Sequence, residues 1–356
     1  MQGVQSHMKP CGQSKSGKLV SSVAALALVA AAACSSCCVR VPSASASVRW
    51  RNSSLAGAAM DLANVSCASI ERCTAVTTHG EVYGTTDGVH WVRSTLSRSP
   101  SGLSGVSCSD AAHCFVAGSD RVTTKGSFQG PYLAVVGAHS AQQYPATPPD
   151  WLDSVSCTDA THCYAVGNDG IILATTDGHT WAREDRGAYS TDLLNGVSCG
   201  DRFHCVAVGG IFRSMTDVGT LETSDGSHWQ YVKQSQYVGG LRSVSCPAVN
   251  DCFAVGVALY NSMGVIFHTS DGRTWTQQAL PPNTGELWSV SCTDVKHCLA
   301  VGENGQAGSM LVTSDGDNWS ALSYGANGPM FFGVSCPEAQ LCYVVGSSGA
   351  IYVGAP

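Results

Sequence analysis

Short runs of apolar residues, separated by polar turn residues, repeat seven times along the chain. A typical repeat begins with Leu-x-x-Val-Ser-Cys at residues Leu241–Cys246 and resumes with a second run at Cys252–Gly256. A third run, Val265–Ser270, leads into an Asp-Gly pair that is followed by a Trp. Short apolar runs between turn residues predict strands, and Asp-Gly predicts a tight hairpin. Each repeat therefore predicts four antiparallel strands, A to D, with strand D starting at the Trp.

The spacing of the repeats indicates how the strands are organised. The distance between the first cysteines of successive repeats runs from 41 residues (Cys67 to Cys108) to 49 residues (Cys108 to Cys157). This period matches one four-stranded blade of a propeller. We therefore predict an all-β fold, a seven-bladed β-propeller of four-stranded blades.

The two ends of the chain indicate how the ring closes. The seventh repeat stops after Ile351–Val353, where strand C is expected, and has no Asp-Gly turn and no Trp. Trp50 lies 17 residues before Cys67, the same spacing as Trp91 to Cys108 and Trp275 to Cys292. We therefore expect the N-terminal strand around Trp50 to supply strand D of the last blade, which removes a free sheet edge.

Every repeat carries two cysteines, separated by five residues that form the predicted A–B turn. The pairs are Cys67 and Cys73, Cys108 and Cys114, Cys157 and Cys163, Cys199 and Cys205, Cys246 and Cys252, Cys292 and Cys298, and Cys336 and Cys342. Cysteines facing each other across a hairpin satisfy disulfide geometry. A metal site is the alternative, because His113, His162, His204 and His297 precede the second Cys, but two Cys and one His fall short of the four ligands that zinc requires. We predict one disulfide per blade and no metal.

The N-terminal segment is typical of an export signal. Three lysines precede the apolar stretch 19–33, which is too short for a comfortable transmembrane helix and fits a signal-peptide core. Two processing sites compete: Cys34 after three alanines resembles a lipobox, which would give a lipid anchor, and Ala44-Ser45-Ala46 fits ordinary signal peptidase. We assign residues 1–46 to export and residues 47–356 to the propeller, which is then secreted or lipid-anchored at the cell envelope.

Charge narrows the choice of partner. Only 13% of the 356 residues are charged, and residues 47–356 carry 15 basic against 26 acidic side chains. Nucleic acid and anionic lipid both require clustered Lys and Arg, so neither is expected to bind. No phosphate-binding loop, nucleophile elbow or zinc helix motif is present, and we expect no cofactor.

The segment Thr-x-Asp-Gly-x-x-Trp, present in five repeats, resembles the Asp box of bacterial neuraminidase repeats, although it lacks the residue between Asp and Gly. The chain as a whole resembles exported bacterial proteins with Val-Ser-Cys repeats, a resemblance that implies no particular activity. Asp-box propellers include sialidases and other glycoside hydrolases, receptors and assembly factors. The resemblance implies that the Asp is structural and binds the backbone of the C–D turn. It assigns this role to Asp87, Asp177, Asp225, Asp271 and Asp315.

One position varies while its neighbours are constant in type: the residue after the first apolar position of strand A. Around the ring it reads Ala63, Ser104, Asp153, Asn195, Arg242, Trp288 and Phe332. We hypothesise that these residues surround the mouth of the channel and that Asp153, Asn195, Arg242, Trp288 and Phe332 contact a ligand. The alternative is that they are adaptable packing at a blade edge.

These observations favour a monomeric, non-catalytic binding module or scaffold for a protein or glycan at the cell envelope. The alternative is a glycoside hydrolase of the sialidase-like propeller type. Such an enzyme requires convergent carboxylates. Asp153, Asp185 and Asp192 could converge on one face, but no catalytic motif surrounds them, so we assign no catalytic residue.

Overall fold

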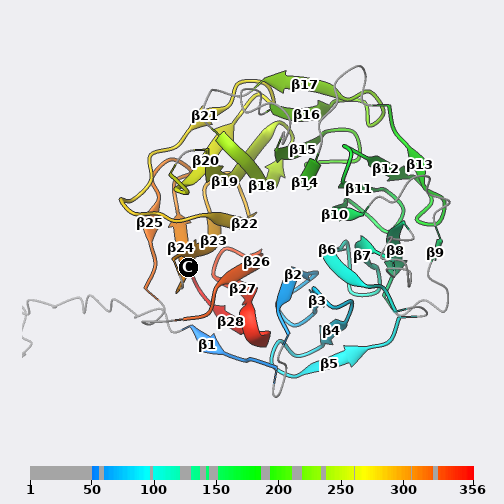
Figure 1. The fold of residues 1–356 in the computed structure, drawn as a ribbon, viewed down its shortest axis with the longest axis horizontal. Coiled ribbons are helices and arrows are strands. Elements are labelled where there is room, and N and C mark those ends of the chain that lie inside the picture. The colour runs from blue at the N-terminus through cyan, green and yellow to red at the C-terminus, as the bar shows by residue number, and fades with distance from the viewer. Residues whose placement is uncertain are drawn as a thin grey trace, which may run out of the picture. The chain divides into compact units, whose positions relative to one another are not determined.

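The computed structural model shows a ring of seven β-sheets surrounding a central axis (Figure 1). Residues 47–356 form one compact unit. The structure describes residues 50–55, 60–96, 99–120, 130–136, 142–143, 151–185, 193–210, 219–233, 238–259, 261–305, 307–323 and 328–356. The predicted export segment 1–46, with Cys34, lies outside the described residues.

Each sheet has four antiparallel strands, and their order in the sheet leads from the central axis outward to the rim. The innermost strands are β2 (Leu62–Cys67), β6 (Gly102–Cys108), β10 (Leu152–Cys157), β14 (Leu193–Cys199), β18 (Val238–Ala248), β22 (Leu287–Cys292) and β26 (Phe331–Glu338). The second strands are β3 (Cys73–Thr77), β7 (Cys114–Ser119), β11 (Cys163–Gly167), β15 (Cys205–Gly210), β19 (Asp251–Ala258), β23 (Cys298–Asn304) and β27 (Leu341–Gly346).

The outer half of each blade is built in the same order. The third strands are β4 (Val82–Thr85), β8 (Pro131–Val135), β12 (Ile172–Thr175), β16 (Gly219–Thr223), β20 (Gly264–Thr269), β24 (Ala307–Thr313) and β28 (Ile351–Gly354). The rim strands are β5 (Trp91–Ser94), β9 (Gln142–Gln143), β13 (Ala182–Arg183), β17 (Gln230–Lys233), β21 (Thr276–Gln277), β25 (Ser320–Ala321) and β1 (Arg51–Asn52). A single 3-10 turn, Ser347–Gly349, completes the described elements.

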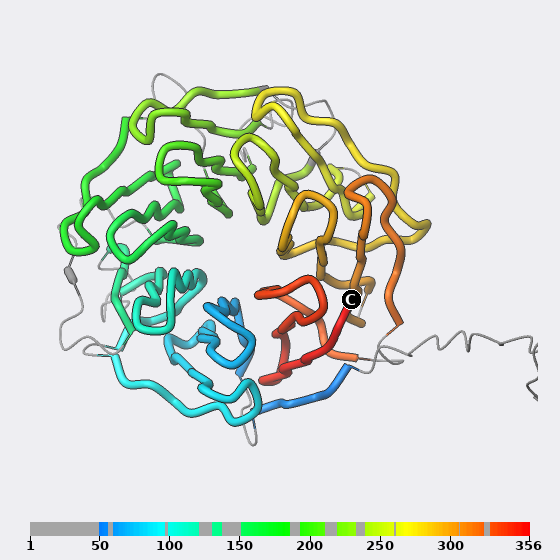
Figure 2. The backbone as a smooth tube through the Cα atoms, turned by 180° about the vertical axis from the view of Figure 1, so that it is seen from behind, coloured from blue at the N-terminus to red at the C-terminus, as the bar shows by residue number. Residues whose placement is uncertain are grey.

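The ring closes as the sequence predicts. Strand β1 pairs with β28 through Arg51 opposite Val353 and Asn52 opposite Tyr352, so the N-terminus supplies the rim strand of blade 7. In the tube view the blue and red ends of the chain meet in this blade (Figure 2). Closure gives blade 7 its fourth strand and sets it beside blade 1, so the edges that remain in each sheet are short ones.

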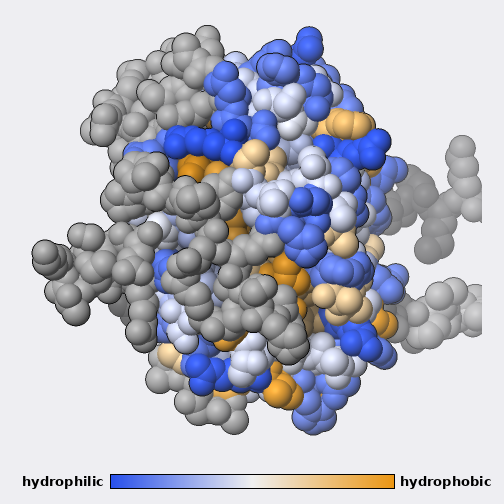
Figure 3. Space-filling model, turned by 90° about the vertical axis from the view of Figure 1, so that its right-hand side faces the viewer, coloured by the Kyte–Doolittle hydropathy of each residue, from blue (hydrophilic) through white to orange (hydrophobic). Residues whose placement is uncertain are grey.

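The apolar core lies in the seams between blades. Among the described residues the buried side chains form seven clusters, each joining the second strand of one blade to the next blade. In every inner strand the apolar residue just before the variable position is at most 1% exposed: Leu62, Leu103, Leu152, Leu194, Leu241, Leu287 and Phe331. One side of the molecule accordingly shows mostly hydrophilic surface with small, separate apolar patches (Figure 3).

All seven predicted disulfides are present, one in each blade. In five blades the paired cysteines lie directly opposite each other on the first and second strands, as with Cys157 and Cys163. In all seven blades their Cα atoms are 3.9–4.1 Å apart. The four His residues that precede a second Cys do not join them. Each His places Nδ1 2.8–2.9 Å from the carboxylate of the Asp three residues earlier.

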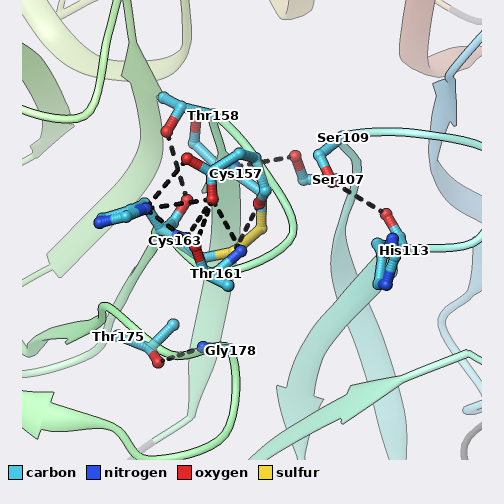
Figure 4. The surroundings of a disulfide bond; sticks show 12 residues. Ser107, Ser109, His113, Cys157, Thr158, Thr161, Cys163, Thr175 and Gly178 are labelled. Atoms are coloured by element: carbon cyan, nitrogen blue, oxygen red, sulfur yellow. Dashed lines mark hydrogen bonds and ion pairs between the residues drawn. A yellow bond between two sulfur atoms is a disulfide. The ribbon is translucent and has the colours of Figure 1, made fainter.

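A ring of hydrogen bonds explains the Ser of the Val-Ser-Cys motif. The Cys157 backbone N–H donates to the Ser107 hydroxyl of the preceding blade at 3.0 Å (Figure 4). The same bond recurs at all seven seams, at 2.9–3.2 Å, including the one from Cys67 to Ser335 that joins the first blade to the last. The hydroxyls thereby satisfy buried N–H groups that the ladders leave free.

Candidate functional site: the mouth of the central channel

The seven variable positions of the inner strands share one backbone feature. In every blade the register between the first and second strands shifts at this residue, for example between Leu152 and Ser154, which flank Asp153. Each variable residue is therefore the extra residue of a β-bulge. A bulged residue makes no ladder pair, and its side chain is aimed away from the regular pleat.

The bulges bring the variable side chains together. A cavity of about 210 Å³ lies on the ring axis, and all seven bulge residues line it: Ala63, Ser104, Asp153, Asn195, Arg242, Trp288 and Phe332. The next residues along the strands, among them Asn64, Ser154, Ser243 and Ser289, form a second layer of the lining. The five residues predicted to contact a ligand thus share one cavity.

The lining is asymmetric around the ring. Blades 1 and 2 contribute the small side chains of Ala63 and Ser104, whereas blades 5 to 7 contribute Arg242, Trp288 and Phe332. Trp288 and Phe332 meet edge to face, with ring centroids 6.0 Å apart. The Arg242 guanidinium carbon lies 4.5 Å from the centroid of the Trp288 ring, a cation–π contact. The cavity consequently has one small-residue side and one aromatic side.

Arg242 is fixed by a carboxylate that the sequence analysis did not identify. Its Nε and Nη2 atoms donate to Oε1 of Glu286 at 3.0 and 2.6 Å. Glu286 directly precedes strand β22 and is 44 residues from Arg242, so the pair depends on two blades meeting. Burial, assisted by the neighbouring charge of Glu286, raises the pKa of Glu303. The guanidinium is therefore paired with the Glu286 carboxylate before any ligand arrives.

Asp153 has a different environment. Burial raises the pKa of its carboxyl group to about 7, against the opposing effects of a hydrogen bond from Trp151 and the charge of Arg242. Its Oδ2 atom is buried and has no hydrogen-bond partner, and the same holds for Nε1 of Trp288. On the next blade, the Asn195 amide donates to the Leu241 carbonyl at 2.7 Å. Two residues that line the cavity thus each carry a buried polar atom without a hydrogen-bond partner.

The five turn aspartates lie at the opposite end of the inner strands. In the third blade, Oδ1 of Asp177 accepts the backbone N–H groups of His179 and Thr180 at 2.7 and 2.6 Å. Thr175 donates to the same carboxylate and accepts the N–H of Gly178, whose φ is +71°. Asp87, Asp225, Asp271 and Asp315 make the corresponding backbone contacts.

The structure does not bring together the other residues considered for a catalytic or metal site. Asp192 lies outside the described residues. Asp185 follows the rim strand β13, and its backbone forms an isolated β-bridge with that of His228, away from the channel. In the ranges that the structure describes, no three His, Cys, Asp or Glu side chains are placed to hold a metal ion. Within those same ranges, no helix is long and apolar enough to cross a membrane.

Comparison with known proteins supports the fold and no family. No protein-family profile and no curated protein matches the chain. Among solved structures, YCF48 bound to D1 peptide is 13% identical, with a TM-score of 0.63 over 89% of this chain and all of that one. A virginiamycin B lyase from Staphylococcus aureus with quinupristin is 8% identical, with a TM-score of 0.67 over 87% and 99%. The WD40 propeller domain of Doa1 is 10% identical, with a TM-score of 0.62 over 86% and 97%. At these identities, what the chain shares with them is the β-propeller fold.

Proposed function

We propose that this chain is an exported, non-catalytic binding module or scaffold of the Asp-box type, which holds a protein or glycan partner in the mouth of its channel. The supporting observation is the bulge ring: the bulge position of the inner strand varies between blades, and all seven of its side chains line one cavity. Variable side chains on a rigid, repeated frame are the usual arrangement of a binding site.

The cavity favours a ligand that combines an apolar group with hydrogen-bonding groups. Trp288 and Phe332 offer aromatic surface, Oδ2 of Asp153 is an unpaired acceptor, and Nε1 of Trp288 is an unpaired donor. A peptide segment and a sugar both present such groups. The solved structure of YCF48 with a peptide gives a precedent for peptide binding on this fold.

The disulfides support export. Seven disulfides are typical of an oxidising, extracytoplasmic environment. Together with the apolar stretch 19–33, they support export to the cell envelope, where we propose a monomer that is either secreted after cleavage at Ala46 or anchored through Cys34.

A glycoside hydrolase is the second candidate because of Asp153. A carboxyl group with a pKa of about 7 is suited to act as a general acid near neutral pH. The second carboxylate that this chemistry requires is not free in the described part of the channel, since Glu286 is bonded to Arg242.

The test is capture of partners from cell-envelope extract by the oxidised protein. Wild type is compared with Asp153→Asn and Trp288→Ala, and Phe203→Ala, an exposed aromatic on an A–B turn, is the control. We expect both channel variants to lose at least tenfold in captured partner while the control retains it. Protease treatment of the extract distinguishes a protein from a glycan. Equal capture by all four proteins would exclude the channel mouth, and turnover of a captured glycan that Asp153→Asn abolishes would establish the hydrolase.

A further inference from the structure

In every blade the residue after the second Cys extends into the seam with the next blade. Around the ring it reads Thr74, Phe115, Tyr164, Val206, Phe253, Leu299 and Tyr343. Where this residue is aromatic, its ring packs edge to face on the Trp of the next blade. The centroid distances are 5.8–6.2 Å for Phe115 and Trp181, Tyr164 and Trp229, Phe253 and Trp319, and Tyr343 and Trp91.

Where the residue is a tyrosine, its hydroxyl also bonds the next blade. Tyr164 in blade 3 donates toward the Gly226 carbonyl at 2.8 Å and lies 3.2 Å from that of Arg202, both in blade 4. Tyr343 in blade 7 donates to the Ile70 carbonyl of blade 1 at 2.5 Å. The Tyr ring therefore occupies a defined space between the Asp-Gly turn and the A–B turn of the neighbouring blade.

The seam between blades 4 and 5 lacks this ring, because Val206 stands in the position. A cavity of about 850 Å³ opens there, lined by Val206, the Cys246 and Cys252 pair, Asn250 and Gly272. Gly272 is the counterpart of Gly226, and the side chain of Asn250, on the A–B turn, lies against it, where the Tyr164 hydroxyl lies against Gly226. Cavities of about 280 and 50 Å³ also lie at the seams that start with Thr74 and Leu299. A missing ring thus accompanies an open seam in three places.

The side of the cavity that lies across from Val206 and the Cys246–Cys252 disulfide, called its far side below, is polar. Glu222, Asp271, Arg273 and the amide of Asn250 all line the cavity. Oε1 of Glu222 accepts the indole N–H of Trp275 at 2.8 Å and the hydroxyl of Thr220 at 3.0 Å. In the aromatic-filled seams, by contrast, Nε1 of Trp91, Trp229 and Trp319 has no partner. Glu222 therefore holds Trp275 to blade 4, beside the space that a ring takes elsewhere.

We propose that the seam between blades 4 and 5 is a second binding site, which accepts the tyrosine side chain of a partner peptide in the space that Tyr164 occupies one seam earlier. Val206 and the Cys246–Cys252 disulfide form an apolar floor for the ring, and the polar far side accepts the phenol hydroxyl. The volume is within the usual range for ligand pockets and leaves room for the residues flanking the tyrosine. The site lies at the turn end of the inner strands and is separate from the channel mouth.

Titration with 4-methylphenol, the tyrosine side-chain analogue, tests the site, with amide NMR of the oxidised protein as the readout. We expect saturable shifts at residues 204–206, 222–224, 250–252 and 271–273, with a Kd on the order of 1–10 mM for eight non-hydrogen atoms. Toluene, which lacks the hydroxyl, is expected to bind at least fivefold more weakly. Equal binding of toluene would overturn the assignment to a phenol, and no shift at these residues up to 50 mM would overturn the site.

Filling the seam from within is the matched variant. Val206→Tyr places the protein's own ring in the cavity, as at the preceding seam, and is expected to weaken 4-methylphenol binding at least tenfold. Val206→Leu imitates the seam at Leu299 and is expected to weaken it several-fold, which keeps the test valid if the tyrosine variant does not fold. Phe115→Tyr adds a tyrosine at a seam that is already filled and is expected to change nothing. Unchanged affinity in both Val206 variants would overturn the proposal.

Discussion

The two ends of the inner strands are built on opposite principles. At the turn end every blade carries the same Val-Ser-Cys segment, one disulfide and one Ser hydroxyl that bonds the next blade. At the channel mouth each blade carries a bulge whose residue differs, from Ala63 to Trp288. The difference shows that the repeated residues solve a problem common to all blades, namely holding neighbours together. Asn195 and Arg242 each bond the next blade from the bulge position, but no such contact is common to all seven bulge residues, so this position is free to differ.

Among the tests of this comparison, reducing the disulfides at the turn end should change the stability of the protein most. By the chain-entropy model each six-residue separation contributes roughly 2 kcal/mol, and the seven together are comparable with the whole stability of a typical domain. We expect full reduction to unfold the propeller at temperatures where the oxidised form is folded. Circular dichroism melts with and without reductant measure this. An unchanged melting temperature after confirmed reduction would mean that the seams alone hold the ring.

The second prediction concerns Asp153 at the channel mouth, which, unlike the disulfides, lowers the stability of the folded protein when it is charged. The folded pKa of Asp153 is about 7, above the unfolded value of 3.8, so the native state holds its proton longer than the unfolded state does. Wild type should therefore lose stability as the pH rises from about 4 to about 7, by up to roughly 4 kcal/mol, and remain at the lower value above pH 7.

Urea unfolding between pH 4 and pH 8 measures this loss. Asp153→Asn should remove that part of the pH dependence and be the more stable protein at pH 8. Asn195→Ala, at the same position of the next blade, is the control and should keep the wild-type slope. If Asp153→Asn retains that slope, the carboxyl group at the mouth is not buried as the structure places it.

The blade number and the closure of the ring could be predicted because both follow from local patterns. Short apolar runs, Asp-Gly turns and the displaced Trp50 each indicate a strand or a missing one. The variable position could be found in the same way, but its bulge could not. A bulge depends on how two strands pair, and no residue type is common to Ala63, Asp153 and Trp288.

Contacts between blades lay beyond sequence reasoning for a similar reason. The pair of Arg242 and Glu286 spans 44 residues, and neither residue belongs to a repeated motif. The open seam at Val206 has a signal in the sequence, because the residue after the second Cys is aromatic in four of the seven repeats and is a valine here. The signal can be interpreted only with the structure, in which Tyr164 reaches the turns of the next blade.

A smaller effect is expected from single seam hydroxyls. Ser335→Ala removes the acceptor for the Cys67 N–H, the bond that joins the last blade to the first, and should cost about 1 kcal/mol of unfolding free energy. Ser66→Ala, at an internal seam, should cost the same if the ring is closed. Ser104→Ala, at the mouth, is the control and should cost little. Chemical denaturation of the three variants compares them, and a cost at Ser66 alone would show that the first and last blades are not joined.

The smallest expected change in stability comes from the turn aspartates and is seen only at acidic pH. The Thr180 hydroxyl and the N–H groups of Thr180 and His179 all donate to Asp177, which lowers the pKa of its carboxyl group below the usual value of 3.8. Because the folded pKa is depressed, the stabilisation is present above about pH 4 and is lost as the pH falls below it. Asp177→Asn should therefore differ from wild type less at pH 2 than at pH 7, as measured by thermal melts at the two values.

Asp317→Asn is the control for that comparison, because Asp317 lies in the corresponding turn of blade 6 and contributes its backbone N–H, not its carboxylate, to the Asp315 cap. It should melt like wild type at both pH values. If Asp177→Asn instead matched wild type at pH 7, the cap would add nothing to stability, and the recurrence of Asp at five turns would need a cause outside the turn. That outcome would remove the distinction between the two ends of the strands, because a repeated residue at the turn end would then be as free to differ as the bulge residue at the mouth.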